Sequence, residues 1–200
     1  LPLILIVPTS LPAKSVKELV ATARSQPGKY SFGSSGVGGA THVTAELFKA
    51  LAGIDIVHVP YKGSGQMMAD LLGGQVQIAF DQIASSIAHV KSGKLRALGI
   101  TTAKRSALLP DLPTIAEGGV AGYEATSWNG FAVRAGTPRT IVNHLQQETR
   151  KAIAVPEIKD KMFGLGIEPV GSTPEQFVAL IRAERDKWIP LFKKIGITPQ

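Results

Sequence analysis

The stretch from Tyr30 to His42, with the sequence YSFGSSGVGGATH, constrains the fold of this chain more than any other segment. A short strand, Tyr30 to Phe32, is predicted to run into a turn rich in glycines and hydroxyl groups, and a helix is predicted to begin at about Thr41. Glycines let such a turn bend and expose its amides, and the N-terminal end of a helix favours negative charge. These features predict an anion pocket for a carboxylate or a phosphate.

Two familiar phosphate-binding patterns do not fit this stretch. No Lys follows as the P-loop pattern G-x-x-x-x-G-K-S/T requires, and Gly36 and Gly38 are followed by Thr41 where G-x-G-x-x-G requires a third glycine. On this motif alone, an anion pocket and a plain tight turn between a strand and a helix explain the glycines equally well.

Strand and helix patterns alternate through the first half of the chain with short links between them. The apolar run from Leu3 to Val7 is typical of a strand buried on both faces. Further strands are predicted at 54–59, 76–80 and 95–100, and helices at 15–25, 64–72 and 83–91. This alternation predicts an α/β fold with a largely parallel sheet flanked by helices.

Polar residues follow the predicted strands, and ligands of such sheets bind outside the carboxyl ends of the strands. In chain order these residues are Ser34 and Ser35, Tyr61 and Lys62, Asp81 and Gln82, and Thr101 and Thr102. Lys62 could pair with a ligand carboxylate or be a solvated turn residue. Asp81 could bind a ligand or cap the helix that begins at Ile83. This convergence indicates a binding site more strongly than the glycine turn alone does.

The second part of the chain is predicted to be mainly helical. A short helix is expected near Thr114 to Glu117, and a strand from Thr126 to Val133. Helices are then expected from an N-cap at Thr137 to about Ala154, at 156–165, and from the capping box Thr173-Pro-Glu-Gln onward.

Composition and residue spacing argue against several classes of function. The net charge is +7, but the 22 Lys and Arg are scattered and do not interleave with aromatic residues, so nucleic-acid binding is not favoured. The absence of cysteine excludes thiol nucleophiles and cysteine metal sites, and the four histidines show no metal-ligand spacing. The sequence therefore predicts no metal and no cofactor. The glycine turn and Asp81 leave one alternative open, an enzyme that acts on a small anionic substrate at the helix N-terminus.

Several motifs resemble, in order along the chain, those of one protein family. They are YSFGSSGVG at 30–38, IVHVPYKG at 56–63, DLLGGQVQ at 70–77, GKLRAL at 93–98, KRS at 104–106, LPT at 112–114, GYEA at 122–125 and EPVGSTPEQF at 168–177. The family is that of the Bug-type extracytoplasmic solute receptors of tripartite tricarboxylate transporters. The resemblance covers essentially the whole chain.

The resemblance implies a periplasmic protein with a two-lobed, type II binding-protein fold and no catalysis. A small carboxylate or dicarboxylate would be the ligand, and membrane transporter subunits would be partners. The ligand loop carries over onto Ser34, Ser35, Gly36, Gly38, Gly39 and Thr41, with Asp81 on the neighbouring strand end. Tyr61 and Lys62, at another strand end, complete the candidate ligand-binding set. Gly39 and Ala40 stand where many relatives have hydroxyl side chains, so backbone contacts are expected there.

The resemblance also implies that the opening part of lobe one is absent from this chain. Residues 12–125 are expected to form a complete lobe two, and residues 1–11 and 126–200 a remnant of lobe one. The chain begins with Leu1-Pro2, so an upstream segment is expected to have been removed or left out. Apolar residues of the remnant would be partly uncovered, because the part of lobe one that they pack against is absent, and this predicts self-association. The apolar residues expected to be uncovered are Phe131, Val133, Phe177, Ile181 and Trp188.

Overall fold

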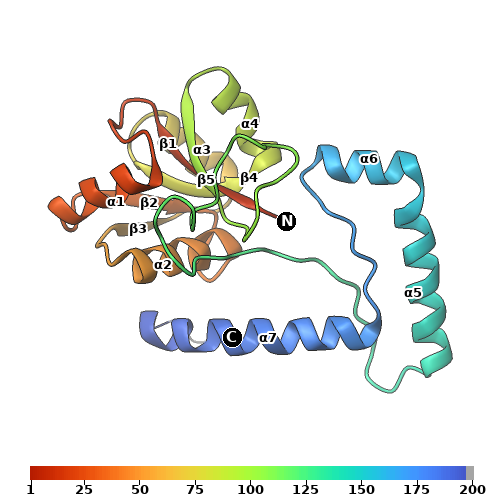
Figure 1. Ribbon diagram of the computed structural model, residues 1–200. Coiled ribbons are helices and arrows are strands. Elements are labelled where there is room, and N and C mark those ends of the chain that lie inside the picture. The colour runs from red at the N-terminus through yellow and green to blue at the C-terminus, as the bar shows by residue number, and fades with distance from the viewer. Residues whose placement is uncertain (197–200) are drawn as a thin grey trace. The chain divides into compact units, whose positions relative to one another are not determined.

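Two compact units make up the chain. The computed structural model describes residues 1–196, except the side chains of residues 194 and 195. Leu1–Ser127 forms the first unit and Trp128–Gln200 the second. In Figure 1 the first unit runs from red to green and the second from green-cyan to blue.

The first unit is an α/β unit built on a five-stranded sheet in the order β3-β2-β4-β1-β5. The strands are β1 (Leu3–Pro8), β2 (Ser31–Ser34), β3 (Val57–Pro60), β4 (Ile78–Gln82) and β5 (Leu95–Ile100). The helices are α1 (Val16–Ser25), α2 (Ala40–Ala52), α3 (Ser64–Leu72) and α4 (Ile83–Lys91). The predicted α/β class is therefore confirmed.

The sheet is mixed rather than largely parallel, which corrects the prediction. β2 is parallel to β3 and β4, whereas β1 is antiparallel to both of its neighbours, β4 and β5. β1 lies inside this sheet and is buried along its whole length. Residues 1–11 therefore belong with the sheet of the first unit, and their predicted grouping with residues 126–200 is wrong.

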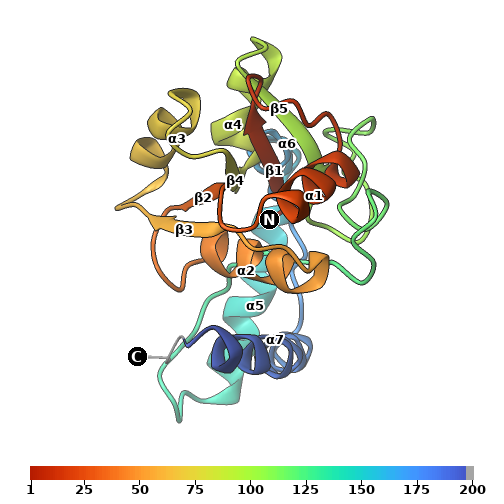
Figure 2. The same cartoon turned by 90° about the vertical axis from the view of Figure 1, so that its left-hand side faces the viewer.

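Helices cover both faces of the sheet. On one face, Ile4 and Ile6 of β1 pack in a cluster with Met67 and Leu71 of α3 and with Ile83 at the start of α4. On the other face, Phe48 of α2 packs against Phe80 of β4 with ring centroids 5.6 Å apart, and Tyr123 closes this second cluster. Figure 2 shows α3 and α4 on the opposite side of the strands from α2. This packing fixes where each helix begins relative to the strand ends.

Two predicted elements are absent from the described residues. Thr126 forms only an isolated bridge with Pro2, and residues 127–133 are irregular rather than a strand. A strand needs a neighbour for its N–H and C=O groups, and none is provided there in the described part of the chain. Thr114 to Glu117 is a turn rather than a helix, anchored by a bridge between Ile100 and Thr114.

The second unit contains three helices among its described residues, α5 (Arg139–Ala154), α6 (Pro156–Gly164) and α7 (Pro174–Ile195). α7 opens with the predicted capping box, in which Thr173 and Gln176 bond to each other's backbone N–H. α5 begins one residue later than expected because Thr137 Oγ1 donates to the Arg134 carbonyl instead of capping the helix. No helix in the described range is both long and apolar enough to cross a membrane.

Candidate functional site

Four strand ends meet at one edge of the sheet, as the sequence predicts. β2, β3 and β4 are parallel, and β5 runs with them because both β4 and β5 are antiparallel to β1. Their C-terminal residues are Ser34, Pro60, Gln82 and Ile100. α2, α3 and α4 each begin just after one of these strands, so three helix N-termini lie at this edge.

None of these three helix N-termini is capped by a side chain. The N-cap residues are Gly39, Gly63 and Gln82, and none accepts a hydrogen bond from its helix through a side chain. By contrast, α1 follows the C-terminal end of β1, which lies at the opposite edge of the sheet because β1 is antiparallel to its neighbours. At the start of α1, Ser15 Oγ accepts the Glu18 N–H. The first amides of a helix need acceptors, and an anion supplies them with the helix dipole in its favour. This edge is therefore suited to binding an anion.

The glycine loop, residues 35–39, is held in shape by its own polar groups. Thr41 Oγ1 accepts the Ser35 N–H at 2.9 Å and lies 3.0 Å from Ser35 Oγ. Gly38 has φ +76°, a backbone conformation that side-chain-bearing residues rarely adopt. Gly39 donates its N–H to the Gly36 carbonyl at 3.4 Å. The hydroxyls of Ser35 and Thr41 thus fix the loop, and its residues 37–39 are exposed.

Tyr61 and Lys62 differ in their surroundings. The Tyr61 N–H donates to the Ser34 carbonyl at 2.9 Å, and its hydroxyl donates to Asp70 Oδ2 at 2.8 Å. Burial and the Asp70 carboxylate raise the pKa of Tyr61 to about 12. Lys62 is exposed in the turn before α3. The structure thus places Tyr61 next to the end of β2 and leaves the Lys62 ammonium at the surface.

Asp81 is buried at the end of β4, with 1% of its surface exposed. Its carboxylate accepts hydrogen bonds from Ser64 Oγ at 3.3 Å, Ser85 Oγ at 2.6 Å and Ser86 Oγ at 3.0 Å. Gln82, not Asp81, is the N-cap of α4. Asp81 therefore joins the first turns of α3 and α4, a role that its position in the sequence did not reveal.

Two histidines that were not among the predicted site residues belong to this region. His42, in the first turn of α2, accepts the Gly38 N–H, and His58 of β3 is hydrogen-bonded to Ser34. Burial lowers the pKa of His42, and burial with the nearby His42 and Lys49 lowers the pKa of His58 to about 4. The parallel pairing of Phe32 with His58, which only the folded sheet reveals, places this histidine beside the glycine loop.

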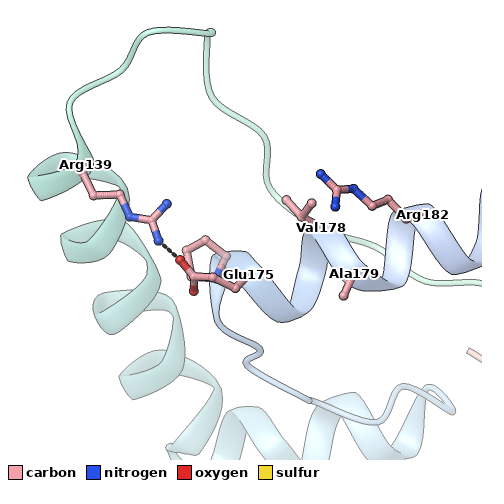
Figure 3. Close-up of a pocket in the computed structure, with 6 residues that line it drawn as sticks. Arg139, Glu175, Val178, Ala179 and Arg182 are labelled. Carbon is pink, nitrogen blue, oxygen red and sulfur yellow. Dashed lines mark ion pairs between the residues drawn. The ribbon is translucent and has the colours of Figure 1, made fainter.

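A groove in the second unit is a weaker candidate. It has a volume of about 310 Å³ and is lined by Arg139, Pro174, Glu175, Val178, Ala179 and Arg182. Figure 3 shows the Arg139 guanidinium paired with the Glu175 carboxylate, and Arg182 further along α7. The ion pair is exposed, so it contributes little and holds no buried charge for a ligand.

The chain matches a known receptor family over nearly its whole length. The family model of the tripartite tricarboxylate transporter family receptors matches residues 1–197, so the chain belongs to this family. The UPF0065 protein in the tcbD-tcbE intergenic region of Pseudomonas sp. (strain P51) is 38% identical over 189 residues. The match covers 94% of this chain and 56% of that relative, so the chain spans little more than half the relative's length.

Solved structures of similar proteins confirm the fold. The structure of R. palustris Rpa4515 with adipate is 38% identical and has a TM-score of 0.88, covering 100% of this chain and 67% of that one. The periplasmic binding protein BugD is 33% identical with a TM-score of 0.84 and the same two coverages. The predicted resemblance to Bug-type receptors with a periplasmic-binding-protein fold is therefore confirmed. The family and these neighbours are binding proteins rather than enzymes.

Proposed function

We propose that this protein is an extracytoplasmic solute receptor that captures a small carboxylate or dicarboxylate in the periplasm. It delivers the ligand to the membrane subunits of a tripartite tricarboxylate-type transporter and catalyses no reaction. The observation that carries this proposal is the meeting of three helix N-termini without side-chain caps at one sheet edge. The likeness to a receptor solved with adipate supports a carboxylate over a phosphate.

The binding residues act in two ways in this proposal. Backbone amides at the uncapped N-terminus of α2 donate to a ligand carboxylate, and the Lys62 ammonium pairs with it from the neighbouring turn. Ser34, Tyr61 and Asp81 hold these groups in position through the hydrogen bonds described above. The full proposed set is Ser34, Ser35, Gly36, Gly38, Gly39, Thr41, Tyr61, Lys62 and Asp81.

The two units correspond, in this proposal, to the lobes of the receptor. Leu1–Ser127 is one complete lobe, and Trp128–Gln200 is part of the other. The second unit exposes several large apolar side chains, including Phe131 and Val133. We propose that this chain self-associates through them, because exposed apolar surface of this kind usually marks an interface.

A thermal-shift screen of mono- and dicarboxylates tests the receptor function. Adipate or another small dicarboxylate is expected to raise the melting temperature, since a ligand that binds only the folded state stabilises it. Lys62→Met is expected to reduce that shift, while Lys17→Met on α1, at the opposite edge of the sheet, leaves it unchanged. If no carboxylate stabilises the protein, the proposed function is wrong.

A further inference from the structure

Two imidazole rings from separate elements lie in contact beside the glycine loop. The rings of His42 and His58 stack with their centroids 3.9 Å apart and their planes 13° apart. Phe32 of β2 stacks on His58 with centroids 4.8 Å apart. His42 is 5% exposed. Burial of two adjacent rings next to an aromatic side chain favours the neutral form of both.

Each ring is bonded to the loop. The Gly38 N–H donates to His42 Nδ1 at 3.0 Å, so Nδ1 carries the lone pair and the proton of the neutral ring is on Nε2. His58 Nε2 lies 2.7 Å from Ser34 Oγ, and Ser34 Oγ accepts the Gly36 N–H at 3.4 Å. The two histidines therefore hold the amides of Gly38 and Gly36, one directly and one through a serine.

Charged groups around the pair come from α2. Glu46 Oε1 lies 3.8 Å from His42 Nε2 and favours a proton on the ring. Lys49 Nζ lies 3.2 Å from the same Glu46 oxygen and opposes it. β2 contributes Phe32 and Ser34, which do not titrate in this range, and β3 contributes His58 itself. The balance keeps the pKa of both histidines below the ordinary value, with burial as the largest cause.

We propose that His42, supported by the stacked ring of His58, is a positioning residue for the glycine loop and makes the loop sensitive to pH. A solvent proton that binds His42 at Nδ1 occupies the lone pair that accepts the Gly38 N–H. That hydrogen bond then breaks, and the two donors oppose each other. The loop loses its fixed conformation at acid pH, and with it the placement of the adjoining N-terminus of α2, whose first amides meet the ligand. The effect on ligand binding rests on the proposed function, whereas the behaviour of the loop does not.

The loop itself can be followed without a ligand. Nuclear magnetic resonance of the full chain reports the protection of the Gly38 amide from hydrogen exchange and the titration of the His42 ring. Between about pH 7.5 and about pH 4.5, the protection factor of the Gly38 amide is expected to fall at least about tenfold. The midpoint of this fall should coincide with the midpoint of the His42 titration. The amide of Phe80 in β4 reports that the core stays folded.

Three variants separate positioning from packing. His42→Asn keeps an acceptor near the position of Nδ1 and cannot titrate, so Gly38 should keep a protection factor within about threefold of the original at every pH. His42→Leu fills the space without an acceptor, and Gly38 protection should be low at every pH. His89→Asn on α4 is the matched control and should change nothing. The proposal is overturned if Gly38 protection does not follow the His42 titration, or if His42→Asn loses protection as His42→Leu does.

Calorimetric titration with adipate adds the functional readout. Over the same pH range, the affinity of the original protein is expected to fall at least about tenfold more than the affinity of His42→Asn. Adipate itself gains protons near the lower end of this range, and the Asn variant corrects for that effect. If neither adipate nor any other carboxylate of the thermal-shift screen binds at any pH, the proposed ligand class fails, while the loop measurement still decides the role of His42.

Discussion

The carboxylate of Asp81 accepts a hydrogen bond from the Ser64 hydroxyl at 3.3 Å and thereby joins the end of β4 to the first residue of α3. The other carboxylate oxygen accepts from Ser85 and Ser86 in the first turn of α4. One buried side chain thus fixes two of the three helix N-termini at the proposed binding edge. The geometry of this edge therefore depends on one buried carboxyl group, and all three of its hydrogen bonds described here come from serine hydroxyls.

Asp81→Asn is expected to lower the free energy of unfolding by about 1–3 kcal/mol, because the new amide nitrogen donates where a serine hydroxyl now donates. Urea denaturation measures the change. Asp111→Asn, at an exposed position in the same unit, is the control and should cost little. Equal effects from the two substitutions would contradict a structural role for Asp81.

Gly38→Ala and Gly65→Ala are expected to change stability in opposite directions. Gly38 has φ +76°, so alanine there should cost about 1–2 kcal/mol, although its Cβ would meet nothing within 4 Å. Gly65 lies inside α3 with the same open space, and alanine there should stabilise by about 0.5–1 kcal/mol. Thermal unfolding of both variants gives the two signs. A stabilising Gly38→Ala would show that the loop does not need its left-handed turn.

Stability should fall as the pH drops below the ordinary histidine value. The pKa of His58 is about 4 in the folded protein, against an ordinary value of 6.5 for a solvated histidine, so the unfolded chain binds more protons between these values. Stability is therefore fully present above about pH 6.5 and is lost progressively toward about pH 4, by about 1–2 kcal/mol after allowance for partial solvent contact.

Urea denaturation at intervals across this range measures the loss. His58→Gln keeps a group near the position of Nε2 that can bond to Ser34, and it should flatten the dependence on pH. The control is His144→Gln on α5, in the other unit. A profile in His58→Gln as steep as that of the original protein would exclude His58 as the source.

The sequence predicted the local elements of the first unit well, for identifiable reasons. α3 and α4 have the predicted bounds because glycines follow both, at Gly73 and Gly93, and β5 matches as well. The direction of β1 was missed because an apolar run shows that a strand is buried on both faces, not which way it runs. The predicted strand at 126–133 is not formed, for a different reason, since a β pattern becomes a strand only beside a partner.

The candidate site was predictable in position but not in its connections. The polar strand ends do meet at one edge, because parallel strands end together. His42 and His58 are far apart in sequence and come into contact only through the pairing of β2 with β3, so no spacing rule reveals their stack. Asp81 shows the same limit. Ser85 and Ser86 are near it in sequence, but Ser64 reaches it from another helix.

Self-association of the chain should depend on the second unit. Phe131 is 85% exposed, Val133 46% and Ile181 40%. Light scattering over a wide range of concentration is expected to show a mass that rises above that of one chain, because such side chains gain free energy when they leave water. Replacement of Phe131 and Val133 by serine should shift the association to higher concentration.

Leu51→Ser is the matched control, because Leu51 is an exposed apolar residue at the end of α2 in the first unit. It should leave the association unchanged if the interface lies in the second unit. An isolated surface leucine is ordinary in soluble proteins, whereas apolar residues gathered within one unit point to an interface. A chain that stays monomeric at every concentration would overturn the prediction. Equal effects of Leu51→Ser and the serine double variant would show that association is non-specific.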